Sequence, residues 1–254
     1  MHQTQVPNDV KFSFSPSDLV LWGNVESLSS ASPYFKTLFN SGFAESTPNK
    51  GNGRTARSAK KVERDFEDSD DETDEFILAR DVDQAASVSP SQFDVPFRLV
   101  EIDESAYTTY LAILCWIDTG HITFAPLRSS FRLQSDPTSL RNAKLVESSI
   151  HPSHPLPASP KSVYRLAHFL ELDELVKIAF SNIQSQLTKE IIAYEVFGDV
   201  ALAYDAIGKM ELDLAVKEWA FVKDSEAMKD VEKSAEGGEM PSFGSMSYKL
   251  CRRL

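Results

Sequence analysis

Cysteine is scarce in this chain of 254 residues, where only Cys115 and Cys251 occur. Two cysteines cannot form a network of disulfides or a zinc site made of several thiolates, and their scarcity fits a reducing intracellular compartment. Long hydrophobic runs are also absent. The longest, residues 110–117, falls well short of the roughly 20 apolar residues of a membrane-spanning helix, and residues 1–9 lack an apolar signal core. The sequence therefore predicts a protein of the cytoplasm or the nucleus that does not insert into a membrane.

Basic residues are too few to balance the acidic ones. The chain has 26 lysines and arginines against 38 aspartates and glutamates, a formal net charge of −12. A protein that holds DNA or RNA on a broad basic face needs clustered Lys and Arg to neutralise phosphates, so we expect no direct binding of nucleic acid. Hydrophobic residues make up 42% of the chain and charged residues 25%, which are ordinary values for a globular protein. The length allows one sizeable core or two small ones.

Two long stretches lack the periodic apolar residues of a folded segment. Residues 54–64 are basic and residues 65–83 are strongly acidic. Together with their flanks they predict a disordered insertion at about 47–92, because such a stretch has too little apolar surface to offset the entropy lost on ordering. Residues 127–159 are rich in proline and serine and predict a second irregular insertion, because proline removes backbone hydrogen bonds. Residues 233–254 are expected to form a flexible tail.

Between these stretches the apolar residues are periodic. Some segments alternate apolar and polar residues, as half-buried strands do, and others follow the helical repeat. The expected strands are 10–14, 19–22, 97–102 and 121–124. The expected helices are 25–31, 33–41, 104–118, 161–170, 172–187, 189–204 and 210–230. This order predicts an α+β domain with a small sheet and a dominant helical part.

No motif of a common enzyme class is present. The nucleophile elbow of serine hydrolases and the glycine loops that cradle phosphates are both absent. His151 and His154 are close together, but the neighbouring prolines prevent the helix that would bring both onto one face. Cys115 lies among apolar residues and is interpreted as a core side chain, while a pairing with His121 or His168 stays open. We therefore expect no catalytic residues, no cofactor, no metal site and no enzyme activity.

The acidic stretch contains two hydroxyl side chains, Ser69 and Thr73, each followed by carboxylates. A kinase with a basic substrate cleft would be attracted to such residues, and each phosphate would add about −1.5 to −2 charges. The two residues are therefore candidate phosphorylation sites, and the alternative is an unmodified, solvated spacer. Residues 57–64 contain several bases in the manner of a nuclear-import signal, interrupted by an acid.

Residues 31–39, Ala-Ser-Pro-Tyr-Phe-Lys-Thr-Leu-Phe, resemble the Ser-x-Tyr-Phe segment and short helix of the BTB/POZ family. Further segments that resemble the family, in the same order along the chain, are 9–14, 19–22, 41–46, 97–102, 106–122 and 163–175. The acidic insertion and the Ser-Pro-Lys-Ser segment at 159–162 are most similar to BTB proteins of fungi.

This resemblance implies a BTB/POZ domain over 9–187, interrupted by the two insertions, with a helical extension over 188–232. Domains of this family form homodimers and bind other proteins, and many are substrate adaptors of Cullin-3-type ubiquitin ligases. The alternative is an oligomerising scaffold or a transcription-linked cofactor that binds no cullin. Apolar side chains of the expected helix 33–41 form a candidate partner or dimer surface, with core packing as the alternative. They are Tyr34, Phe35, Leu38 and Phe39.

Overall fold

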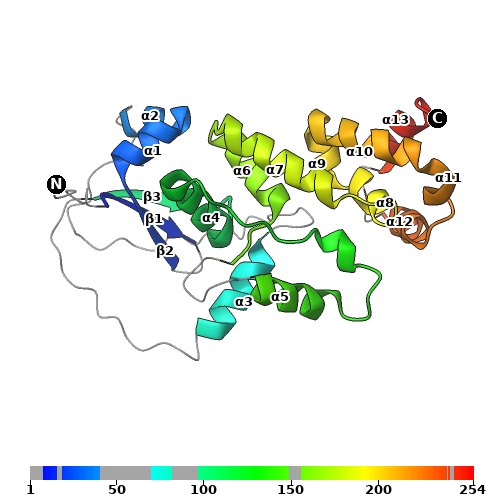
Figure 1. Ribbon diagram of the computed structural model, residues 1–254, viewed down its shortest axis with the longest axis horizontal. Helices are drawn as coiled ribbons and strands as arrows, with labels where there is room; N and C mark the ends of the chain where they lie inside the picture. Colours follow the sequence, from blue (N-terminus) through cyan, green and yellow to red (C-terminus); the bar gives the residue numbers. More distant parts are fainter. Residues whose placement is uncertain are drawn as a thin grey trace.

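The structure is a computed structural model. It describes residues 8–15, 19–40, 70–81, 97–148, 156–238, 240 and 243–254. The described part of the chain is elongated. A small sheet with its covering helices lies at the N-terminal end, and a run of helices leads to the C-terminal end (Figure 1). The molecule therefore has the mixed α+β architecture that the sequence predicts.

Three strands form one mixed sheet in the order β2-β1-β3. The central strand β1 (Val10–Phe14) pairs antiparallel with β2 (Leu19–Gly23) and parallel with β3 (Arg98–Ile102). Every second side chain of β1 is buried, because successive residues of a strand point to opposite faces of the sheet. All three strands lie where the sequence predicts them.

Two short helices follow the first hairpin, α1 (Val25–Ala31) and α2 (Pro33–Asn40). The side chain of Asn24 accepts two hydrogen bonds from backbone N–H groups in the first turn of α1, which satisfies donors that a helix start leaves unpaired. Pro33 begins α2, where its missing N–H needs no partner. Both helices confirm the sequence-based expectation.

The first hydrophobic core lies between the sheet and the helices that cover it. Three further helices contribute to it: α4 (Tyr107–Thr119), α6 (Pro160–Phe169) and α7 (Asp173–Gln186). The ring of Phe12 is fully buried and lies 6.0 Å from the Phe35 ring and 5.7 Å from the Tyr110 ring, between centroids. Gly120 ends α4 with a φ of 71°, a left-handed conformation that glycine adopts without strain.

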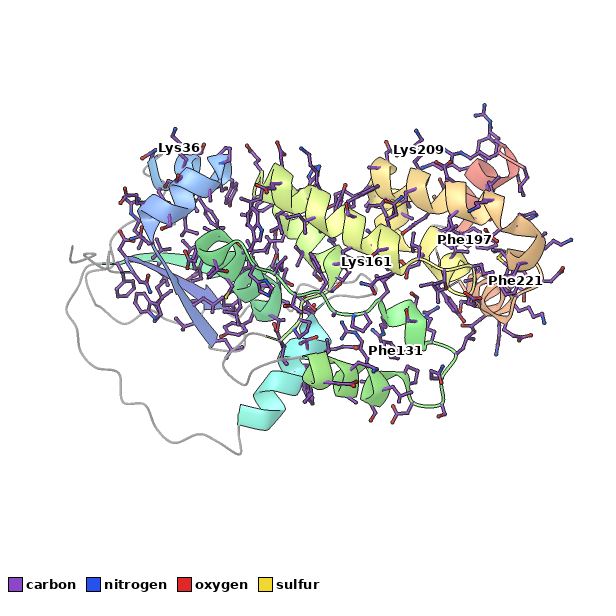
Figure 2. All side chains as sticks on the ribbon, in the orientation of Figure 1. Lys36, Phe131, Lys161, Phe197, Lys209 and Phe221 are labelled. Carbon is purple, nitrogen blue, oxygen red and sulfur yellow. The ribbon has the colours of Figure 1, made fainter. Side chains whose placement is uncertain are left out.

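The six helices from α8 onward form a second hydrophobic core at the C-terminal end (Figure 1). They are α8 (Ile192–Val196), α9 (Asp199–Ala203), α10 (Asp205–Lys217), α11 (Trp219–Val222), α12 (Glu226–Glu236) and α13 (Phe243–Cys251). Tyr194, Phe197, Val231 and Met246 are buried in this core, and Figure 2 places Phe197 within the C-terminal group of helices.

The helices of the C-terminal part differ from the sequence-based expectation in three respects. The single helix expected over 210–230 is divided among α10, α11 and α12. The single helix expected over 189–204 is two short helices, because Gly198 between them is extended (φ −75°, ψ 160°). The flexible tail expected from 233 is wrong over α13, because Met246 and Leu250 are four residues apart, lie on one helix face and are buried in the second core.

The disordered insertion expected at 47–92 is wrong over α3 (Asp71–Asp81). This helix has no apolar stripe, and hydrogen bonds donated by other elements to the carboxylates of Asp74 and of the buried Asp70 hold it in place. The rest of the expected insertion lies outside the described residues, apart from Asp70 itself.

The irregular insertion expected at 127–159 is also wrong in part. It contains the 3₁₀ helix η2 (Arg128–Phe131) and the helix α5 (Pro137–Ser148). Proline is tolerated at the first position of α5, for the reason given above for α2. The strand expected at 121–124 is reduced to one isolated bridge between Phe124 and Ala158.

A buried ionic cluster lies where the two cores meet. The Nζ atom of Lys161 on α6 lies 2.6 Å from Oε2 of Glu195 on α8, and both side chains are at most 5% exposed. Glu211 on α10 is also buried, and burial, followed by the charge of Glu195, raises its pKa well above the usual value for a glutamate, while Lys161 opposes the shift. Figure 2 shows Lys161 near the middle of the long axis. The cluster therefore ties α6 to the C-terminal helices.

Candidate functional site

A groove of about 420 Å³ opens between the sheet and the helices that cover it. Elements far apart in the sequence line it: α2, the end of β3 with the turn after it, the start of α3, and α6. In this article it is called the central groove. It has an aromatic side and an acidic side, which are described in turn.

The aromatic side is formed by Tyr34 and Phe169. The centroids of their rings lie 4.7 Å apart, and Phe169 is 52% exposed. Phe169 ends α6, and Leu170 directly after it is fully buried. Glu171 then adopts a φ of 58°, which is uncommon for a residue other than glycine, and turns the chain into α7. This turn leaves the ring of Phe169 at the surface, beside the half-buried ring of Tyr34.

The acidic side comes from the end of β3 and the turn after it. Glu101, Asp103 and Glu104 are exposed there, and Asp71 of α3 lies at the same groove. Among the described lining residues Arg165 is the basic one. With the buried Asp70, five carboxylates against one guanidinium line the groove and give it a negative potential, which attracts a cationic partner.

The start of α3 borders the central groove and is held by its own carboxylates. Asp74 accepts hydrogen bonds from the backbone N–H groups of Tyr107 and Thr108, at 2.7 and 2.8 Å, and from the Thr108 hydroxyl at 2.7 Å. It thereby caps α4, because Ala106 at the N-cap position has no side chain that could do so. Burial raises the pKa of Asp74, although these hydrogen bonds act in the opposite direction.

Asp70 forms a second, fully buried attachment. It accepts hydrogen bonds from the backbone N–H of Ser159, which is the N-cap residue of α6, at 3.0 Å, and from the hydroxyl of Thr109 at 2.8 Å. The guanidinium of Arg141 on α5 lies 4.0 Å from Asp70 and donates a hydrogen bond to the hydroxyl of Thr73 at 3.4 Å. Helix α3 is therefore attached to α4, α5 and α6 by a buried polar network.

The structure separates the residues that the sequence analysis grouped as a partner or dimer surface. Tyr34 lies at the rim of the central groove, half-buried. Phe35 and Leu38 also line the groove, but they and Phe39 are at most 8% exposed and belong to the first core, which is the core packing that the sequence analysis gives as the alternative. Their spacing on α2 places them on one helix face, which packs on the sheet.

The candidate phosphorylation sites differ in placement. Thr73 is fully buried on α3 and takes part in the polar network of Asp70 and Arg141. A kinase needs an exposed, extended segment, so Thr73 is not a substrate in this conformation. Ser69 lies outside the described residues.

The part of the chain that the structure describes contains no cluster of three or more His, Cys, Asp or Glu side chains that could bind a metal ion. Burial raises the pKa of the Cys115 thiol, which disfavours the thiolate that a nucleophile requires. His168 is exposed and contacts the ring of Tyr204, and His151 and His154 lie outside the described residues.

The sequence analysis missed Phe169 and the acidic residues of the central groove. Phe169 lies next to His168 on the exposed side of the amphipathic helix α6. An apolar ring on the polar face of a helix is the sequence feature that could have indicated a binding residue. Glu101, Asp103 and Glu104 are consecutive in sequence except for one buried isoleucine, but their relation to α6 depends on the tertiary fold.

No family model matches the chain, and no curated protein matches its sequence. Within the described ranges, none of the helices is both long and apolar enough to cross a lipid bilayer.

Proposed function

We propose that the protein is a protein-interaction module of the BTB/POZ kind, without catalysis of its own. The order of its elements supports this: two strands and two short helices, then, after the inserted helix α3, a parallel strand and a mostly helical remainder. The resemblance of residues 31–39 and of the later segments to that family points in the same direction. The domain is extended at its C-terminal end by the helices from α8 onward.

The single observation that carries the proposal is the central groove. An exposed aromatic ring at a groove, with charged residues around it, is the usual composition of a protein-binding hot spot. The carboxylates select for a partner that presents Lys or Arg beside an apolar anchor. The anchor would contact Phe169 and Tyr34, and the cations would face Glu101, Asp103 and Glu104.

Substitution of Phe169 tests this proposal. We expect Phe169→Ala to reduce the recovery of specific partners from native cells about tenfold, as loss of a hot-spot ring does. Phe221→Ala is the matched control, because Phe221 is 42% exposed on α11, at the other end of the molecule. Partner recovery is measured by affinity purification and quantitative mass spectrometry, with thermal denaturation of both variants as a check of folding. Equal recovery by the two variants would contradict the proposal.

The same experiment separates two versions of the function. A substrate adaptor of a Cullin-3-type ubiquitin ligase recovers Cullin-3 with the wild-type chain at native salt. An oligomerising scaffold or a transcription-linked cofactor recovers other proteins and no cullin.

A further inference from the structure

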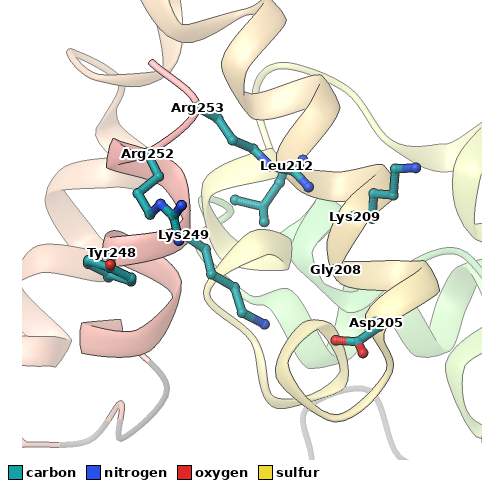
Figure 3. A pocket seen from close by; sticks show the side chains of 8 residues that line it. All are labelled: Asp205, Gly208, Lys209, Leu212, Tyr248, Lys249, Arg252 and Arg253. Carbon is teal, nitrogen blue, oxygen red and sulfur yellow. The ribbon is translucent and has the colours of Figure 1, made fainter.

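A second groove, of about 530 Å³, lies at the C-terminal end of the molecule, far from the central groove along the long axis. It runs between α10 and α13, and Figure 3 shows the side chains that line it. They are Asp205, Gly208, Lys209, Leu212, Tyr248, Lys249, Arg252 and Arg253. In this article it is called the basic groove.

The floor of the basic groove is rigid. Gly208 and Leu212 on α10 are buried, and a Cβ atom at position 208 would lie 2.2 Å from the carbonyl oxygen of Ala201. Glycine is thus required for α10 to approach α9 so closely. Met246 and Leu250 attach α13 to the same core. The two helices that form the groove are therefore held in place by packing before a ligand arrives, which lowers the entropy lost on binding.

The walls carry four cations and one carboxylate. Lys209 comes from α10, and Lys249, Arg252 and Arg253 come from α13 and the residues directly after it. Figure 3 shows the Lys249 side chain extending from α13 towards α10. Arg253 forms an ion pair of 2.7 Å with Asp213 on α10, which holds the end of α13 against the groove. Such a concentration of positive charge is notable on a chain with a net charge of −12.

The groove also offers apolar contact area. Tyr248 is 65% exposed, and the guanidinium of Arg252 lies 5.8 Å from the centroid of its ring, a cation–π geometry that holds the arginine in place. Arginine binds carboxylates through two parallel hydrogen bonds, while tyrosine packs against aliphatic or aromatic side chains. The groove therefore suits a ligand in which carboxylates flank an apolar side chain.

The charge of the whole molecule favours a short ligand. A long polyanion such as nucleic acid would meet repulsion from the rest of a chain of net charge −12, because its charge extends far beyond the groove. A segment of a few residues experiences mainly the local cations. We propose that the basic groove binds a short acidic peptide segment of a partner protein, in which Asp or Glu residues flank an aromatic or aliphatic residue.

Fluorescence anisotropy with a labelled probe tests this inference on the full chain. The probe is the peptide Glu-Asp-Glu-Phe-Asp-Glu-Glu, and we expect a Kd of about 1–100 µM at low salt. The double variant Lys249→Glu with Arg252→Glu should weaken binding at least about tenfold. Lys177→Glu with Lys223→Glu makes the same change in net charge at exposed positions outside the groove, and it should retain binding within about twofold. A probe with Gln and Asn in place of Glu and Asp should not bind.

Three outcomes would overturn the inference: no binding of the acidic probe by the wild-type chain, equal weakening by the two double variants, or tighter binding of a single-stranded oligonucleotide or of phosphatidylserine vesicles with the same dependence on Lys249 and Arg252. Thermal denaturation checks that the variants fold. Lys249→Gln with Arg252→Gln, which removes the charges without reversing them, repeats the measurement if the first variant does not fold.

Discussion

At the scale of single residues, Glu211 is a buried carboxyl whose pKa is raised well above the usual value for a glutamate, by burial first and by the charge of Glu195 second. Its carboxyl is buried next to Glu195, and one of its oxygens has no hydrogen-bond partner among the described residues. The charge of Lys161 is already neutralised by Glu195 at 2.6 Å. A second carboxylate there would be buried without a cation of its own, so the folded state favours the protonated form of Glu211.

The raised pKa of Glu211 predicts that the free energy of unfolding depends on pH, and that Glu211→Gln removes this dependence. Below the ordinary glutamate pKa, Glu211 is protonated in both the folded and the unfolded state, so its titration makes no contribution to the pH dependence of stability. As the pH rises from there towards the raised pKa of the folded state, the unfolded chain loses a proton that the folded chain keeps, and stability falls by up to about 1.4 kcal/mol per pH unit. The Gln variant lacks this loss, so its stability relative to the wild type increases with pH.

Urea denaturation at about pH 5, 6, 7 and 8 measures the difference between the two proteins. Glu232→Gln, at an exposed position of α12, is the control and should show a constant difference from the wild type. A constant difference for Glu211→Gln as well would show that the carboxyl titrates normally in the fold.

At the scale of secondary-structure elements, α3 is the helix whose position depends most on a few polar contacts. Asp74→Ala removes three hydrogen bonds at the start of α4. We expect a loss of about 1–3 kcal/mol in the free energy of unfolding, together with faster amide hydrogen exchange in α3 and in the first turn of α4. Exchange in α10, which belongs largely to the second core, should not change.

Glu75→Ala is the matched control for this prediction. Glu75 is a neighbouring carboxylate on the same helix, and it is exposed. If Glu75→Ala destabilised the protein as much as Asp74→Ala does, the effect would come from the general charge of the helix and not from the cap of α4.

Elements with a local apolar pattern were predictable from the sequence, and elements held by distant polar contacts were not. The alternation in residues 10–14 and the helical spacing in 33–40 are visible in the chain itself. The carboxylates of Asp70 and Asp74 look like members of a solvated charge run, since their donors, Thr109, Thr108 and Ser159, come from other elements. The formation of helix α3 thus depends on contacts with other elements and not on its local sequence.

Part of the candidate site was predictable. Tyr34, Phe35 and Leu38 belong to the segment that resembles the BTB/POZ family, and all three line the central groove, Phe35 and Leu38 with little exposure. Phe169, which lies beside Tyr34 on the same side of the groove, and the acidic turn at 101–104 are brought there by the packing of α6 and β3 around the first core. No local pattern carries that information.

At the scale of the whole molecule, the open question with the largest consequence is self-association. The resemblance to the BTB/POZ family implies a homodimer. Because Phe35, Leu38 and Phe39 are buried in the first core, a different surface would have to form the dimer interface. Strand β2 is an edge of the sheet, and Trp22 on it is 46% exposed, with its ring 5.3 Å from that of Phe97. An edge strand with exposed aromatic side chains is suited to pairing with a second copy.

We therefore predict that the protein is a dimer at micromolar concentration. Light scattering after size-exclusion chromatography should give twice the 28.3 kDa mass of one chain. Trp22→Ser should shift the protein to the monomer mass. Leu202→Ser, at an apolar position that is 39% exposed on α9, should leave the dimer intact. A wild-type protein that elutes with the mass of one chain would refute the prediction.

The attachment of α3 has a consequence for which anions the protein can take up. The start of a helix presents unpaired N–H groups and a partial positive charge, and it attracts phosphates and carboxylates from solution. The chain supplies its own carboxylates to α4 and α6, from Asp74 and Asp70. Because these internal ligands are tethered, their effective concentration is in the millimolar range or above. Free phosphate therefore competes poorly for the start of either helix, because the carboxylates of Asp74 and Asp70 already accept the hydrogen bonds there.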